Sequence, residues 1–120
     1  MQQTQRLVAI LPCNDLDRSE AFYRRLGFEH RDGDDDYRML SDGQGGELHL
    51  NRAVEGWVIP GRNPFGLYLY LEAVDELAAK MDCKAEDKPW GMYEFALSDP
   101  DETLVRVGWP SRLRADKTKQ

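Results

Sequence analysis

The chain has 120 residues, 41% of them hydrophobic and 32% charged, which is typical of one globular domain that needs no disulfides. Its formal net charge of −6 argues against general binding to nucleic acid or anionic membranes, because phosphate groups would be repelled. No apolar run approaches the roughly 20 residues of a membrane span, and residues 1–6 lack the apolar core of a signal peptide. We therefore predict a cytoplasmic protein with neither a nucleic-acid nor a membrane partner.

The first half of the chain predicts one strand, one helix and three strands. A β-branched, apolar run predicts the first strand over residues 6–12. Asp17 and Glu20 have capping-box spacing, and apolar residues then recur at helical spacing up to Leu26. Gly27 stands where the residue after a helix adopts positive φ. Alternating patterns predict the remaining strands over 28–31, 36–41 and 47–51, with turns at 32–35 and 42–46.

The second half repeats the same order of elements after a connection rich in glycine and proline. The expected elements are a strand over 67–72, a helix over 74–81, a weak strand or coil over 84–87, and strands over 92–98 and 103–109. Neither Cys13 nor Cys83 belongs to a CxxC pair, so we predict two free thiols that pack as small hydrophobic side chains.

The repeated order predicts an α+β fold built from two βαβββ modules. Each module exposes one apolar sheet face, and two such sheets that curve toward each other would enclose a cleft. We predict a single domain over 1–111, with module one at 6–51, a connection at 52–65 and module two at 66–109. The tail at 112–120 is polar and lacks periodicity, so we expect it to be disordered.

Two segments resemble the glyoxalase/bleomycin-resistance/dioxygenase proteins, also called the vicinal-oxygen-chelate superfamily. Residues 14–28 (NDLDRSEAFYRRLGF) resemble the opening of the superfamily, and 88–101 (KPWGMYEFALSDPD) resemble the closing half of its bleomycin-resistance branch. The likeness covers about residues 6–109, with VDEL at 74–77 at the start of the second helix. It implies paired βαβββ modules, a homodimer, and a bleomycin-type glycopeptide as the prototype ligand.

The resemblance also indicates where a metal would lie in the members that use one. Those members hold a divalent ion with a His on the first strand of each module and a Glu on the last. The corresponding positions here are Val8, His49, Gly66 and Arg106, of which only His49 can ligate, with Glu47 beside it on the same strand face. Arg106 would repel a cation. We therefore expect no metal and no cofactor, which argues against metal-dependent glyoxalase or dioxygenase chemistry.

A further departure from the family concerns the turn at 99–103, where Glu102 and Thr103 replace the usual Gly-Asn pair. Glycine tolerates positive φ and glutamate does so poorly, so we expect a small loss of stability or a reshaped turn.

Aromatic side chains on or near loops are the first candidates for a ligand site. A large ring on a loop needs a covering partner, which can be a ligand, a dimer partner or the core. Tyrosines that alternate with leucines on one strand place one face toward a cleft or the solvent. These candidates are Trp57, Phe65, Tyr68, Tyr70, Trp90 and Tyr93.

The remaining candidates lie on predicted strands. Tyr37 and Met39 share one strand face, where they line either a cleft or the core. His49, with Glu47 nearby, either hydrogen-bonds a ligand, acts as a base near neutral pH, or is a satisfied structural histidine. Arg106 either binds a ligand carboxylate or forms an internal ion pair with Glu47 or Glu94.

Three functions follow from these observations. The first is a homodimeric binding protein that sequesters a bulky aromatic or cationic compound in a metal-free cleft. The second is a glyoxalase-related lyase or isomerase, or a dioxygenase-type enzyme, of the same fold, with His49 as the residue that would act in a metal-free reaction. The third is a regulatory or stress-related interaction module without a ligand. Fold similarity alone does not choose the ligand.

Overall fold

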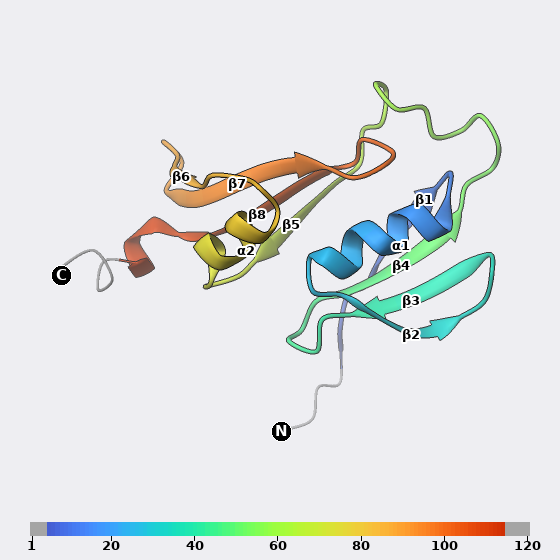
Figure 1. The fold of residues 1–120 in the computed structure, drawn as a ribbon, viewed down its shortest axis with the longest axis horizontal. Coiled ribbons are helices and arrows are strands. Elements are labelled where there is room, and N and C mark those ends of the chain that lie inside the picture. Colours follow the sequence, from blue (N-terminus) through green and yellow to red (C-terminus); the bar gives the residue numbers. More distant parts are fainter. Residues whose placement is uncertain (1–4, 115–120) are drawn as a thin grey trace. The chain divides into compact units, whose positions relative to one another are not determined.

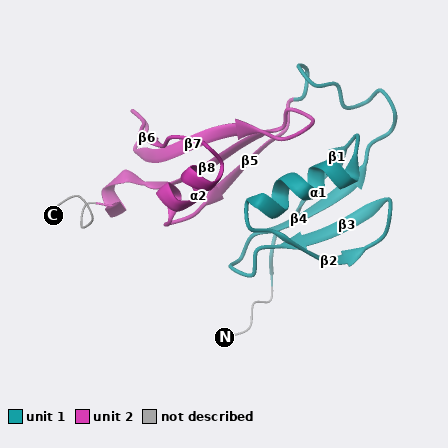
Figure 2. Ribbon diagram, in the orientation of Figure 1, with its two compact units in different colours: residues 1–63 teal, residues 64–120 magenta. Residues whose placement is uncertain are grey.

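The structure, a computed structural model, describes residues 5–114 as an α+β fold with two four-stranded sheets. The chain divides between residues 63 and 64 into two compact units, each with its own sheet and helix (Figure 2). We call residues up to 63 unit one and residues from 64 unit two. In the described part of the chain, neither helix has the length and apolar character needed to span a bilayer.

Unit one is a βαβββ module (Figure 1). Its sheet has the order β1-β4-β3-β2, in which β1 and β4 are parallel and the other neighbours are antiparallel. The bounds of its elements are β1 Ala9–Cys13, α1 Leu16–Arg25, β2 Glu29–Gly33, β3 Tyr37–Ser41 and β4 Glu47–Arg52.

Unit two repeats this topology with the sheet order β5-β8-β7-β6, and again only the first pair, β5 and β8, is parallel. The prediction of paired βαβββ modules is therefore confirmed. The bounds are β5 Gly66–Tyr70, α2 Val74–Lys80, β6 Glu86–Asp87, β7 Met92–Ser98 and β8 Leu104–Pro110, followed by the short 3₁₀ turn η1 Ser111–Arg114.

In each unit the core lies between the helix and one face of the sheet. Alternation along the strands sends one set of side chains to this face and the other set to the opposite, open face. The buried apolar residues of unit one include Leu11, Leu16, Tyr23, Leu40, Leu48 and Leu50. Those of unit two include Val74, Leu77, Ala78, Phe95, Val105 and Val107. The open faces carry exposed aromatic and apolar side chains, and these provide the candidate site.

Helix α1 begins earlier than the sequence predicted. Its N-cap is Asp15, whose carboxylate accepts a hydrogen bond from the backbone N–H of Arg18 at 3.1 Å. The predicted capping box is wrong because Arg38 of β3 donates to both of its carboxylates, at 2.8 Å to Asp17 and 3.2 Å to Glu20. The hydrogen bond to Asp17 raises the pKa of the Arg38 guanidinium. The end of the helix is as predicted, since Gly27 has a φ of 105°.

Several boundaries differ from prediction by a few residues. Strand β1 begins at Ala9 instead of residue 6, and β5 spans Gly66–Tyr70 instead of 67–72. Strand β2 extends to Gly33, into the turn predicted at 32–35, because the observed turn begins only at Asp34. The Asp34 carboxylate accepts from the backbone N–H groups of Asp36 and Tyr37, at 2.8 and 3.0 Å, and these bonds lower its pKa. Cys13 is buried, Cys83 is half-buried, and no disulfide joins them.

The predicted disordered tail is wrong for its first residues. Residues 112–114 belong to η1, which is held by side-chain contacts rather than by apolar periodicity. Arg114 stacks over the ring of Tyr93, with its Cζ 3.5 Å from the ring centroid, and pairs with Asp75 at 3.2 Å. Ser111 donates to Asp87 at 2.6 Å. The rest of the predicted tail, 115–120, lies outside the described residues.

Replacing Glu102 by glycine is expected to stabilise the protein by about 0.5–1 kcal/mol, because Glu102 has a φ of 63°. The left-handed conformation penalises a Cβ that glycine lacks, which is the reason why the sequence predicted either a small loss of stability or a reshaped turn here. Urea unfolding measures the change. Glu76→Gly, at an exposed position of α2, is the control and should lose about 1 kcal/mol. A loss of stability in both variants would contradict the strain at Glu102.

Candidate functional site

The open face of unit two gathers side chains from three neighbouring strands. The register places Tyr68 of β5 beside Arg106 of β8, which lies beside Ala96 of β7. One step further along, Gly108 of β8 lies between Tyr70 and Glu94. Residues in register share a face, so these side chains all lie on the side opposite α2. The rings of the two tyrosines contact each other, with centroids 4.8 Å apart.

Glu94 is the polar centre of this face, although it is only 2% exposed. Its Oε1 accepts a hydrogen bond from the hydroxyl of Tyr68 at 2.8 Å and another from the indole N–H of Trp90 at 3.2 Å. The guanidinium of Arg106 lies 3.9 Å from the other carboxylate oxygen. A buried carboxylate needs such partners, because an unpaired charge inside a protein is strongly destabilising. Burial and the bond to Glu94 raise the pKa of the Tyr68 hydroxyl.

Gly108 makes room for this arrangement. A Cβ at position 108 would collide with the hydroxyl oxygen of Tyr68, and it would lie 2.7 Å from the Cβ of Glu94 and 2.9 Å from the carbonyl oxygen of Tyr93. Two of these atoms are held by the β7–β8 ladder and move little. Glycine at this position therefore lets the Tyr68 hydroxyl reach Glu94 across the strand.

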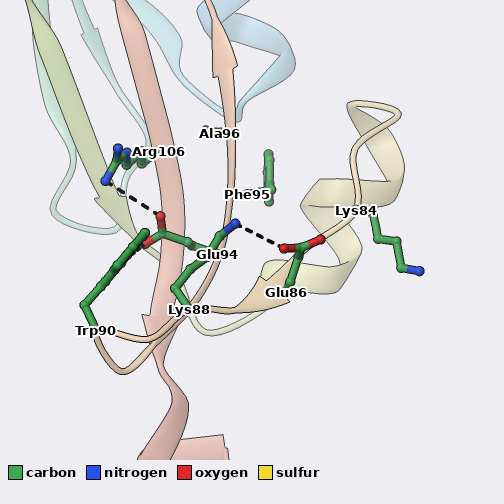
Figure 3. A pocket seen from close by; sticks show the side chains of 8 residues that line it. All are labelled: Lys84, Glu86, Lys88, Trp90, Glu94, Phe95, Ala96 and Arg106. Atoms are coloured by element: carbon green, nitrogen blue, oxygen red, sulfur yellow. Dashed lines mark hydrogen bonds and ion pairs between the residues drawn. The ribbon is translucent and has the colours of Figure 1, made fainter.

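Trp90 borders a cavity of about 330 Å³ on this face. Its ring is 58% exposed, and the turn that carries it places its N–H toward Glu94 (Figure 3). The guanidinium carbon of Arg106 lies 5.8 Å from the ring centroid, within the range of a cation–π contact. Lys88 pairs with Glu86 at 3.1 Å on the side of the cavity away from Arg106 (Figure 3). The cavity is lined by Lys84, Glu86, Lys88, Trp90, Glu94, Phe95, Ala96 and Arg106.

The structure does not bring Tyr93 to this cavity. Tyr93 precedes Glu94 on β7, so it points to the face that α2 covers. There its hydroxyl donates to Asp75 of α2, and this bond raises the pKa of Tyr93. Arg114 stacks over the ring and also pairs with Asp75. These contacts give Tyr93 a structural role in fastening η1 and α2 to the sheet.

The open face of unit one carries a second group of predicted residues. The hydroxyl of Tyr37 and Nδ1 of His49 are hydrogen-bonded at 2.8 Å, and Met39 lies opposite His49 in the β3–β4 register. Glu47 pairs with Arg6 at 2.8 Å. A cavity of about 260 Å³ lies beside these side chains and is lined by Arg6, Arg31, Asp32, Met39, Leu40, Ser41, Glu47 and His49. His49 is thus already engaged through one ring nitrogen.

Trp57 and Phe65 are exposed aromatic residues that do not line the described cavity of their own unit. Trp57 belongs to the connection in unit one and is 79% exposed, and Phe65 immediately precedes β5 in unit two and is 43% exposed. Their exposure is consistent with a contact outside their own unit, as the sequence had suggested for aromatic rings on loops.

Sequence reasoning missed several residues of the unit-two cavity. Glu94 had been considered only as an ion-pair partner of Arg106, and Gly108, Lys84 and Lys88 had not been considered. One signal was present: Glu94 is an acidic residue inside the otherwise apolar strand β7. A charged side chain at such a position is buried only when it is paired. Two partners of Glu94, Tyr68 and Arg106, lie on other strands and so could not be recognised from the local pattern.

The side chains at the four family ligand positions do not fit the divalent ion that the metal-using members of the resembled superfamily hold. Val8 and Gly66 offer no side-chain ligand, and Arg106 is a cation paired with Glu94. Only His49 can ligate, and its Nδ1 bonds Tyr37. Across residues 5–114, no group of three or more His, Cys, Asp or Glu side chains is placed to hold a metal. A hard cation needs several such ligands, so these residues do not form a metal site.

Comparison with solved structures shows what the chain is similar to. A bleomycin-binding protein solved in complex with bleomycin is 28% identical, with a TM-score of 0.77 over 88% of this chain and 98% of that one. The bleomycin resistance determinant encoded on transposon Tn5 is also 28% identical, with a TM-score of 0.77 over 89% and 98%. A lactoylglutathione lyase from Agrobacterium tumefaciens shares the fold at 23% identity, with a TM-score of 0.66 over 93% and 98%. No protein-family model and no curated protein matches the sequence.

Proposed function

We propose that this chain, a member of the vicinal-oxygen-chelate superfamily of the bleomycin-resistance-like type, binds and sequesters a bulky aromatic compound. The observation that carries the proposal is the exposed ring of Trp90, held by Glu94 at the edge of the unit-two cavity. An indole that is fixed by a hydrogen bond and open on its face is a pre-organised surface for stacking, which lowers the entropic cost of binding.

We propose further ligand contacts on the open face of each unit by itself. They are Tyr68, Tyr70 and Arg106 in unit two and, separately, Tyr37, Met39, Glu47 and His49 in unit one. We include Trp57 and Phe65 as contacts made in a homodimer, because each ring is exposed within its own unit. Tyr93 is left out because it lies under α2. In this proposal the protein acts as a cytoplasmic homodimer without a metal or cofactor.

Metal-free bleomycin is the first compound to test, since two similar solved structures are bleomycin-binding or bleomycin-resistance proteins. Isothermal titration of the purified protein is expected to give saturable binding near one ligand per subunit. Elemental analysis of the same sample is expected to find no stoichiometric divalent metal. No heat of binding together with a stoichiometric metal would contradict sequestration.

That opposite result would favour the second candidate, an enzyme of the same fold. The observation behind it is the 2.8 Å contact between the Tyr37 hydroxyl and Nδ1 of His49, which orients the imidazole and leaves Nε2 for a ligand. A histidine whose Nδ1–H donates to a hydroxyl oxygen has its lone pair on Nε2, where it can accept a proton from a ligand. The contact also suits simple ligand binding, and the unit-two cavity has no comparable base, so sequestration remains the proposal.

A further inference from the structure

We infer that the unit-two cavity takes an aromatic group that carries an anionic substituent, such as an aromatic carboxylate. This inference deepens the proposed function and rests on it. It concerns only the part of the ligand that contacts Trp90, and it follows from which charges in the cavity are accessible and which are already used.

The negative charge of Glu94 is not available to a ligand. Its side chain is 3% exposed, and its Oε1 is occupied by two donors, the Tyr68 hydroxyl and the Trp90 indole. The other oxygen, Oε2, lies 3.9 Å from the guanidinium of Arg106, so a cationic ligand that approached Glu94 would meet a like charge. Glu94 therefore serves to hold the site together.

The accessible charges of the cavity are mostly positive. Arg106 has 42% of its side chain exposed and Lys88 has 31%, and Lys84 is exposed as well. The accessible carboxylate is Glu86, which pairs with Lys88, so these two charges offset each other and the positive excess comes from Arg106 and Lys84. This local balance is opposite in sign to the net charge of −6 of the whole chain. A cationic cavity in an acidic protein favours an anion at this position over a cation.

Arg106 is the group best placed to bind that anion. Its distance of 3.9 Å to Glu94 is too long for a hydrogen bond, and within residues 5–114 its guanidinium makes none. A guanidinium offers five N–H donors in a planar fork that matches a carboxylate. It also lies 5.8 Å from the centroid of the Trp90 ring. An aromatic carboxylate can stack on Trp90 and direct its charge to Arg106 at the same time.

Three probes with one ring system test the inference: 2-naphthoate, 2-naphthylmethanol and 2-naphthylmethylammonium. Calorimetric titration of the full chain is expected to give the tightest binding for the naphthoate, about tenfold tighter than the alcohol, with the ammonium weakest. Arg106→Gln is expected to weaken naphthoate about tenfold and to leave the alcohol unchanged, which shows that the stacking surface is intact. The matched control is Arg112→Gln, an exposed arginine of η1 that lines neither cavity, and it should change none of the three affinities.

Three results would overturn the inference. The first is an ammonium probe that binds as tightly as the naphthoate. The second is a naphthoate affinity that Arg106→Gln does not lower, and the third is the absence of naphthoate binding. In each case the bleomycin titration decides the proposed function separately. Bleomycin binding without a preference for the naphthoate leaves sequestration standing, whereas the absence of binding by all four compounds removes both.

Discussion

Replacing Gly108 by alanine is expected to destabilise the protein by about 2 kcal/mol, because the new methyl group overpacks the face of unit two. It would meet the Tyr68 hydroxyl, the Cβ of Glu94 and the carbonyl oxygen of Tyr93, and the last two cannot move without disturbing the β7–β8 ladder. Urea unfolding followed by circular dichroism measures the change.

The matched control is Gly66→Ala in the same sheet. A Cβ at position 66 makes only ordinary contacts, at 3.7 Å to the carbonyl oxygen and 3.9 Å to the Cβ of Leu104. This variant should be neutral or more stable by up to about 1 kcal/mol. Combining Gly108→Ala with Tyr68→Phe should recover part of the loss, since the hydroxyl is the first atom that the methyl group meets. Equal stabilities of Gly108→Ala and Gly66→Ala would contradict the close packing described for Tyr68 and Glu94.

Replacing Trp90 by alanine is expected to weaken bleomycin binding about 30-fold, which is the effect of removing a central aromatic contact from a binding site. The residue is 58% exposed, so little packing is lost, but buried Glu94 loses one of its two donors and the free energy of unfolding should fall by about 1–2 kcal/mol. Isothermal titration measures the affinity, and urea unfolding checks the fold.

Tyr93→Phe is the control for this experiment. It alters a neighbouring aromatic residue on the opposite face of the sheet, where the hydroxyl bonds Asp75, and it should leave the affinity unchanged. The site would be wrongly placed if Trp90→Ala bound bleomycin as well as the unaltered protein does, or if Tyr93→Phe proved to be the weaker binder.

The order of elements could be predicted because it depends on local patterns. Alternation in the strands, helical spacing in α1 and the turn residues between them are all visible within a few residues of each other. Gly27 could be recognised as the end of α1 for the same reason. The start of α1 could not, because Asp17 and Glu20 fit a capping box as well as they fit the ion pair with Arg38 that they make. The choice between the two depends on a strand distant in sequence.

The candidate site was predictable only in part, again for a physical reason. Alternation indicated that Tyr68 and Tyr70 share a face, and the structure agrees. Alternation could not show which of the two sets of alternate residues in β7 faces α2. Tyr93 was therefore grouped with Trp90, although the two side chains lie on different faces of the sheet. Glu94 and Gly108 acquire their roles only through the β7–β8 register, which no local pattern encodes.

The most direct test of ligand binding at the open face of unit two is a titration of ¹⁵N-labelled protein with metal-free bleomycin, observed at the indole N–H resonances. The chain has three tryptophans, Trp57, Trp90 and Trp109, so their signals can be assigned with single variants. We expect the Trp90 resonance to shift saturably, because its N–H is bonded to Glu94 at the edge of the cavity. Trp109 lies in register with Tyr93 on the helix-covered face, and its resonance should not shift. Saturable binding that leaves the Trp90 resonance unchanged, or no binding, would contradict a ligand site beside Trp90.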